Sequence, residues 1–307
     1  MTRDVRNVAA SVRQRLNNLA KERGRPFQEV LQYFAIDRFL YRLSDSTHRD
    51  RFILKGAMML SAWRAPATRS TMDIDLLGRG EDPTGSMLNI VRELCDLEPT
   101  QEDGLVFDAS SVVNEPITVD SEYVGMRVTF RGTLGAARIP MQIDLGIGDA
   151  VVDPEAQIEL PTLLNFPPAR LRGYSRESAV AEKLHAMFQH GRLNSRLKDY
   201  FDIWLLSRNF LFDGEKLSRA IHETFLRRAT EVKAETIGLT QEFASQPGKQ
   251  VQWTAFLRKL GIADAPPKLE DVVAQLHVFL HPVLRALVES QAIEKQWLPD
   301  GGWHSRA

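Results

Sequence analysis

The hydrophobic pattern changes near residue 168, and this change limits the possible folds. Residues 106–113, 123–130 and 140–148 alternate apolar and polar side chains and are rich in β-branched and aromatic residues, which indicates strands. A proline-rich crossing follows at 154–168. Beyond it the spacing is helical, with helices predicted at 175–188, 192–209, 213–229, 231–245, 250–260 and 268–293 and a loose tail after 298. The pattern therefore predicts a sheet-containing part followed by a helical part.

The N-terminal part combines helices with short strands. Helices are predicted at 4–23 and 27–43, a strand at 51–56, and helices at 57–63 and 84–99. We expect three regions: N-terminal helices at 1–48, an α/β domain at 49–168 and a helical domain at 169–307.

Composition excludes several classes of protein. The 307 residues carry a net charge of -1, which argues against a generic DNA-coating protein. The single cysteine, Cys95, excludes a disulfide framework and a thiolate zinc site, and its helical pattern places it in the core. No uninterrupted apolar run reaches the roughly 18 residues of a membrane span, and no leader segment is evident. We expect a cytoplasmic protein.

Charge is nevertheless segregated along the chain. Residues 1–55 carry twelve Lys/Arg against six Asp/Glu, whereas residues 81–125 carry eleven Asp/Glu against one Arg. A basic N-terminal face could bind RNA or a nucleotide, although a solvated surface is the usual explanation.

Two acids one residue apart are the first candidate site. In the stretch Arg69-Ser-Thr-Met-Asp73-Ile-Asp75-Leu-Leu-Gly78, a strand would project Asp73 and Asp75 to the same face. Like charges this close are unfavourable unless a cation neutralises them, and hard oxygen ligands suit Mg²⁺ or Mn²⁺. The alternative is a strand end with two solvated acids.

Two further features flank this pair in the sequence. Lys55-Gly56 joins a predicted strand to a helix, a turn that suits a phosphate but is also common without one. Asp144 is a lone acid in an apolar strand and shares its face with Gln142. An acid in such a strand is costly to bury unpaired, so Asp144 is a candidate third carboxylate; the alternative is a surface acid at the strand end.

The helical part carries a second set of charged residues. Lys183 lies in an alanine-rich helical segment, and Asp199 and Asp202 are three residues apart on one helical face. Exposed ion pairs that contribute little to stability would explain Lys183 as well as the Asp199 and Asp202 pair. A functional role for these residues stays open.

These pieces occur in a recognisable order: Lys55-Gly56, Asp73-Ile-Asp75-Leu, Ile143-Asp144, Ala181-Glu-Lys183-Leu-His-Ala and Arg196-Leu-Lys198-Asp199-Tyr-Phe-Asp202. The ordered set resembles the nucleotidyltransferase-like AbiEii/AbiGii toxin family, which includes mycobacterial relatives that modify transfer RNA. The resemblance spans roughly residues 50–210. It implies an α+β fold, with a polymerase-β-like nucleotidyltransferase domain (a mixed sheet flanked by helices) and a helical C-terminal domain.

The resemblance also implies roles. Asp73, Asp75 and the less certain third acid Asp144 match metal-binding positions for Mg²⁺ or Mn²⁺. Lys183 matches a lysine that contacts the triphosphate of an NTP, and Asp199 and Asp202 match the acids of the last motif. The expected nucleotide-binding positions are Lys55, Gly56, Arg69, Ser70, Arg196 and Lys198. The implied partners are an RNA acceptor, which could be the 3′ end of a transfer RNA, and an antitoxin protein.

One departure keeps alternatives open. Family members usually have a second glycine and a small hydroxyl residue after the Lys-Gly turn, where this chain has Ala57 and Met58. The first hypothesis is a Mg²⁺-dependent nucleotidyltransferase that transfers a nucleotide from an NTP to an RNA and acts as the toxin of a toxin–antitoxin or phage-defence system. The second is a catalytically silent member that binds RNA or a partner protein. A different Asp-x-Asp metal enzyme, such as a glycosyltransferase or phosphohydrolase, ranks last because the rest of its motifs is missing.

Overall fold

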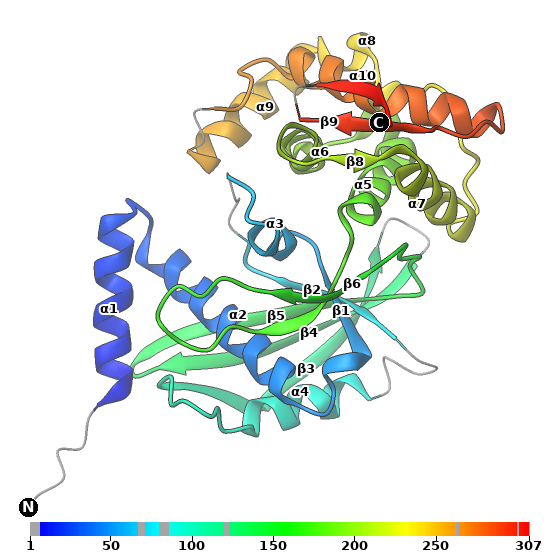
Figure 1. Cartoon of the computed structure of the whole chain (residues 1–307). Helices are drawn as coiled ribbons and strands as arrows, with labels where there is room; N and C mark the ends of the chain where they lie inside the picture. Colours follow the sequence, from blue (N-terminus) through cyan, green and yellow to red (C-terminus); the bar gives the residue numbers. More distant parts are fainter. Residues whose placement is uncertain are drawn as a thin grey trace, which may run out of the picture. The chain divides into compact units, whose positions relative to one another are not determined.

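The structure is a computed structural model that describes residues 7–66, 71–79, 86–119, 123–261, 264–299 and 301–306. The chain forms two compact units. The sheet unit comprises Met1–Arg64, Ser70–Gly148 and Glu155–Gly173, and the helical unit comprises Ala65–Arg69, Asp149–Pro154 and Tyr174–Ala307. Each unit is described by itself below (Figure 1).

The sheet unit is built on a seven-stranded mixed sheet of order β3-β4-β5-β2-β1-β7-β6. β2 pairs parallel with β5 and β1 pairs parallel with β7, while the other neighbours are antiparallel. This confirms the predicted mixed sheet. The strands are β1 (Phe52–Lys55), β2 (Ile74–Gly78), β3 (Leu105–Val119), β4 (Tyr123–Leu134), β5 (Ala137–Ile147), β6 (Glu155–Glu159) and β7 (Arg170–Gly173).

Helices cover the apolar face of this sheet. α2 contacts β5 and β7, α4 contacts β3, and α1 lies against α2. Phe39 of α2 packs on Phe107 and Phe130 with ring centroids 5.4 and 4.9 Å apart, which anchors the core. Cys95 is buried there as predicted, and burial raises the pKa of its thiol to about 12. The helices are α1 (Val8–Glu22), α2 (Phe27–Asp45), α3 (Met58–Ala62) and α4 (Met87–Asp96), with a 3₁₀ turn at Arg49–Arg51.

The helical unit surrounds α10, whose buried face contacts α6, α7 and α8. By length and mean hydropathy (1.3) α10 could span a membrane, but its apolar side chains form the core of this unit. The helices are α5 (Arg176–His190), α6 (Leu197–Asn209), α7 (Gly214–Arg227), α8 (Gln241–Ala244), α9 (Pro247–Leu260) and α10 (Leu269–Val288). 3₁₀ turns form at Gly191–Leu193 and Ile237–Leu239 (η3).

The start of α5 follows the sequence prediction. Ser175 is its N-cap, and the hydroxyl accepts a hydrogen bond from the backbone N–H of Ser178 at 3.3 Å. This cap fixes the first turn of the helix that carries Lys183.

Three local predictions were wrong. The helix expected at 231–245 is an irregular segment with η3 and the short α8, because Gly238 packs against Tyr200, whose hydroxyl donates to its carbonyl at 2.9 Å. The tail expected to be loose forms a hairpin of β9 (Lys295–Leu298) and β10 (Gly302–Ser305), which pairs with β8 (Phe212–Asp213). The proline-rich crossing contains β6, which pairs with β7 at the sheet edge.

Candidate active site

A row of charged side chains crosses five strands of the sheet unit. Asp75 is the register partner of Lys55 on β1 and of Asp144 on β5. Asp144 is the partner of Arg127 on β4, which is in turn the partner of Glu115 on β3. Register partners on neighbouring strands share one face of a sheet, so Asp75 and Asp144 stand side by side with a cation beyond each of them. We call this the acid row.

The opposite face carries apolar residues from the same strands. Ile74 and Leu76 of β2 are fully buried, at 0% and 1% exposure, while Asp75 between them is half-buried. Asp73 directly precedes β2 and shares the parity of Asp75. The prediction that Asp73 and Asp75 project to one face, opposite Ile74 and Leu76, is consistent with this pattern.

The Gly56 turn lies directly against the Asp75 carboxylate. Gly56 has φ +71°, and a Cβ at this position would approach Asp75 Oδ2 to 1.9 Å. Only glycine leaves room for the carboxylate here. Ala57 follows with φ -68°, so alanine costs nothing in backbone strain at that position. Met58 stands where family members usually have a small hydroxyl residue. It is 2% exposed and belongs to the buried hydrophobic core.

Arg127 holds Asp144 in a bidentate ion pair. Its Nε and Nη2 donate to Oδ1 and Oδ2 of Asp144, both at 2.8 Å, and Gln142 Nε2 donates to the same carboxylate at 3.2 Å. The hydrogen bond with Asp144 raises the pKa of the Arg127 guanidinium, and the charge of Asp73 adds to the effect. Arg127 thus neutralises part of the negative charge that was predicted to require a metal ion.

A cavity of about 510 Å³ adjoins the acid row. Asp73 lines it together with Thr129 and Gln142, which are register partners on the same face. Gln32 of α2 closes one side, donating from Nε2 to the carbonyl of Pro140 at 2.7 Å. The cavity therefore brings amide and hydroxyl groups next to a carboxylate.

The helical unit holds the second group of predicted residues, which we call the lysine cluster. Lys183 Nζ donates to Asp199 Oδ1 at 2.9 Å and to Asp202 Oδ2 at 2.7 Å. Arg196 Nε donates to the other oxygen of Asp199 at 2.7 Å. Both aspartate side chains are 1% exposed, while Lys183 is 16% exposed. The predicted pair on one helical face thus faces the predicted lysine.

The charge of Asp199 is stabilised by its two cations. Burial alone would raise the pKa of this carboxyl, but Lys183 and Arg196 more than offset the burial and hold the pKa below its ordinary value. Asp199 is therefore ionised in the folded protein. Lys198, beside it in sequence, is exposed.

Two predicted nucleotide-binding positions, Arg69 and Ser70, lie outside the described residues. One residue of the site was missed by the sequence analysis. Arg127 belongs to a strand that was predicted, but its partner lies 17 residues away on β5, and only the strand register reveals the pair.

Comparison with known proteins identifies the family. Residues 38–275 match the family described as the nucleotidyl transferase AbiEii toxin of a type IV toxin–antitoxin system. The chain belongs to the AbiEii family. The match confirms the resemblance and extends beyond the residues on which it was based. It makes the chain a member of a family of nucleotidyltransferase toxins, for which a nucleotide substrate and an antitoxin partner are implied.

Other comparisons give distant likenesses. No curated protein matches the chain. Two crystal structures from Helicobacter pylori are similar, one of a candidate nucleotidyltransferase and one of JHP933. Each is 14% identical, covers 86% of this chain and has a TM-score of 0.47, over 98% and 94% of the respective neighbour.

Proposed function

We propose that this AbiEii-family chain transfers a nucleotide from an NTP to an RNA with the help of Mg²⁺ or Mn²⁺. In this reaction a hydroxyl oxygen of the RNA bonds to the α-phosphorus of the NTP, and pyrophosphate leaves. The proposal also makes the chain a cytoplasmic toxin that an antitoxin neutralises, in a toxin–antitoxin or phage-defence system. The observation that carries it is the acid row, with Asp75 and Asp144 side by side next to Asp73 and the Gly56 turn.

The donors at the acid row fit a hard divalent cation. Asp73 and Asp75 offer carboxylate oxygens on a half-buried face, and hard oxygen ligands suit Mg²⁺ or Mn²⁺. A bound Mg²⁺ or Mn²⁺ would neutralise phosphate charge and lower the pKa of the attacking hydroxyl. In this assignment Asp73 and Asp75 are the principal ligands.

Asp144 is proposed to have a different role from Asp73 and Asp75. Both of its oxygens already accept hydrogen bonds from Arg127, so a metal ion would compete with Arg127 for this carboxylate. We propose that Arg127 holds Asp144 towards Asp75 and that Asp144 accepts the proton of the incoming hydroxyl or completes the ligand set. Arg127 is thus a positioning residue.

Lys183 is proposed to bind the β- or γ-phosphate of the NTP. Asp199 and Asp202 hold its ammonium group at 2.9 and 2.7 Å, which fixes the direction of a flexible side chain. A positioned cation on the leaving pyrophosphate stabilises the charge that develops there. Asp199 and Asp202 therefore act through Lys183, with Arg196 supporting Asp199.

RNA as the acceptor is supported by charge and by the cavity. Arg13, Lys21 and Arg23 are exposed on α1 or at its end, and basic side chains of this kind bind phosphate backbones. The cavity beside Asp73 offers Thr129 and Gln142, which can hydrogen-bond to a sugar or a base. The 3′ end of a transfer RNA is the first acceptor to test.

A second candidate function has its own support. Met58 removes a phosphate-binding hydroxyl, and Arg127 already pairs with Asp144, which favours a catalytically silent member that binds RNA or a partner protein.

One experiment separates the two candidate functions. Purified wild-type protein and Asp75→Asn are each incubated with every α-labelled NTP in turn, Mg²⁺ and total cellular RNA. Label on RNA that disappears with the variant supports the enzyme. RNA binding without label transfer for any NTP supports the silent member.

Toxicity is tested separately. Growth should stop on expression of the wild-type chain and continue on expression of Lys183→Ala at the same protein level. Equal arrest by both chains would separate toxicity from nucleotidyl transfer.

A further inference from the structure

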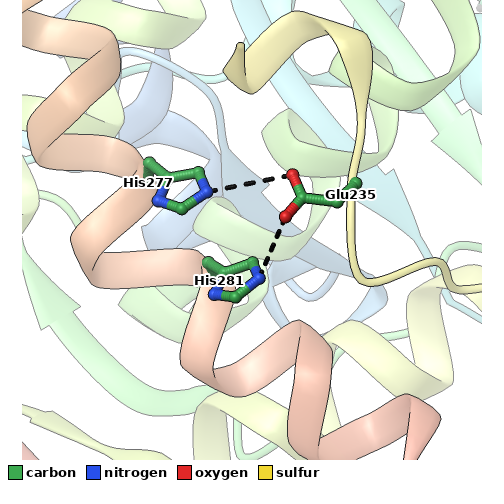
Figure 2. A group of neighbouring side chains, drawn as sticks. All are labelled: Glu235, His277 and His281. Carbon is green, nitrogen blue, oxygen red and sulfur yellow. Dashed lines mark ion pairs between the residues drawn. The ribbon is translucent and has the colours of Figure 1, made fainter.

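Two histidines on α10 face one carboxylate, far in sequence from either candidate group. His277 and His281 are one helical turn apart, and Glu235 comes from the segment between α7 and η3 (Figure 2). Nε2 of His281 lies 3.1 Å from Glu235 Oε1, and Nε2 of His277 lies 3.8 Å from Oε2. The two rings are stacked, with centroids 4.6 Å apart and planes inclined by 13°.

The spacing is close to that of a metal site. One ligand atom from each residue lies within 4.8 Å of the other two. Zinc bonds to imidazole and carboxylate are roughly 2.0–2.2 Å, so ligands of one ion are separated by up to about 4 Å. The two distances from histidine Nε2 to a carboxylate oxygen of Glu235, 3.1 and 3.8 Å, lie within that limit.

The helix fixes most of this geometry in advance. Leu276 and Leu280, each adjacent in sequence to one of the histidines, are 0% exposed and anchor α10 in the core. His277 and His281 are 41% and 28% exposed on the outer side. Side chains four residues apart on a helix project together, so the imidazole pair is held by a rigid element.

We propose that His277, His281 and Glu235 form a Zn²⁺ site on the helical unit. Two imidazoles and a carboxylate without sulfur suit zinc, and water completes the tetrahedron. The ion would join the irregular segment before η3 to α10, the core helix of the unit. It would stabilise the folded state, because the unfolded chain does not hold the three ligands together. This site is separate from the hard-oxygen site proposed at the acid row.

Isothermal titration of tag-free protein with Zn²⁺ tests this proposal. Excess Mg²⁺ is present throughout to occupy hard-oxygen sites. We expect one Zn²⁺ per chain in the wild type, with affinity weakened roughly tenfold or more in His277→Ala and in His281→Ala and less in Glu235→Gln. His222→Ala is the matched control, since His222 is also an exposed helical histidine beside a carboxylate, with Nδ1 3.7 Å from Glu223. Its affinity should equal that of the wild type.

A second measurement uses the unmodified chain. In a ¹⁵N–¹H spectrum of the imidazole rings, one equivalent of Zn²⁺ should shift the signals of His277 and His281 and leave His222 unchanged. Zinc affinity that is equal in all four variants, or ring signals that shift at other histidines only, would overturn the proposal. An absence of zinc binding to the wild type would do the same.

Discussion

In the acid row two carboxylates stand beside each other with a cation on either side, whereas in the lysine cluster one ammonium lies between two carboxylates. The two groups also differ in exposure. Asp75 and Asp144 are half-buried, while the side chains of Asp199 and Asp202 are 1% exposed. Similar residue types thus serve different purposes. Half-buried acids can be reached by a further cation from solvent, whereas the buried acids of the lysine cluster already hold the ammonium group of Lys183 in place.

The comparison predicts that the lysine cluster contributes more to stability than the acid row. In Lys183→Met two buried carboxylates lose their shared cation, so we expect the free energy of unfolding to fall by ~4 kcal/mol. Urea denaturation at neutral pH measures this change. Lys216→Met, at an exposed position on α7, is the control and should change stability by less than about 0.5 kcal/mol. Equal effects of the two variants would contradict the assignment of Lys183 to a buried cluster.

Asp199→Asn should cost ~3 kcal/mol at pH 7, because Lys183 and Arg196 lose the charge that they face. The cost depends on pH. Since the pKa of Asp199 is lowered in the folded state, its stabilisation is complete above the ordinary value of 3.8 and is lost as the pH falls below it. Denaturation curves at pH 7 and pH 3 give the difference in unfolding free energy between the wild type and Asp199→Asn. This difference should be smaller at pH 3 than at pH 7.

The exposed Asp264→Asn is the control for that experiment. A gap between wild type and Asp199→Asn that stays constant from pH 7 to pH 3 would show that charge is not the cause.

Gly56→Ala tests how closely the phosphate turn and the acid row are joined. It should lower stability by ~2 kcal/mol, about half from the positive φ and the rest from the collision with Asp75 Oδ2. Gly24→Ala separates these causes, because Gly24 has φ +62° and a Cβ added there would meet nothing within 4 Å, so only the backbone cost of ~1 kcal/mol applies. Nucleotidyl transfer should fall in Gly56→Ala and remain in Gly24→Ala. Equal stability and equal activity of Gly56→Ala and Gly24→Ala would contradict the close contact between Gly56 and the Asp75 carboxylate.

The smallest effect is expected from Arg127→Gln. The Arg127 and Asp144 side chains are 34% and 20% exposed, so loss of their bidentate pair should cost ~1 kcal/mol. The same change removes the cation that competes for Asp144, so divalent metal should bind more tightly. Arg170→Gln breaks a cross-strand pair with Glu159 at the sheet edge and should leave metal affinity unchanged. Weaker metal binding in Arg127→Gln would show that positioning of Asp144 by Arg127 outweighs the competition between Arg127 and the metal for this carboxylate.

Alternation along the chain was sufficient to predict β3 to β5 and the apolar face opposite Asp73 and Asp75. It was insufficient at the sheet edge, where β6 and β7 are short and the neighbouring prolines suggested an irregular crossing. The segment around Gly238 follows a helical pattern, but its contact with Tyr200 outweighs local preference. The pairing of Arg127 with Asp144 depends on the register of β4 and β5, which no local pattern contains.

Asp73 and Asp75 are proposed to hold the divalent cation of a nucleotidyltransferase. Electron paramagnetic resonance of Mn²⁺ with a non-hydrolysable NTP measures bound metal directly, and Asp108→Asn, which disrupts an exposed Asp–Arg pair on β3 and β4, is the matched control. Mn²⁺ should bind to the wild type and to Asp108→Asn, and its affinity should fall by about a hundredfold or more in Asp73→Asn/Asp75→Asn. Equal Mn²⁺ affinity in the folded double variant and the wild type would contradict this proposal.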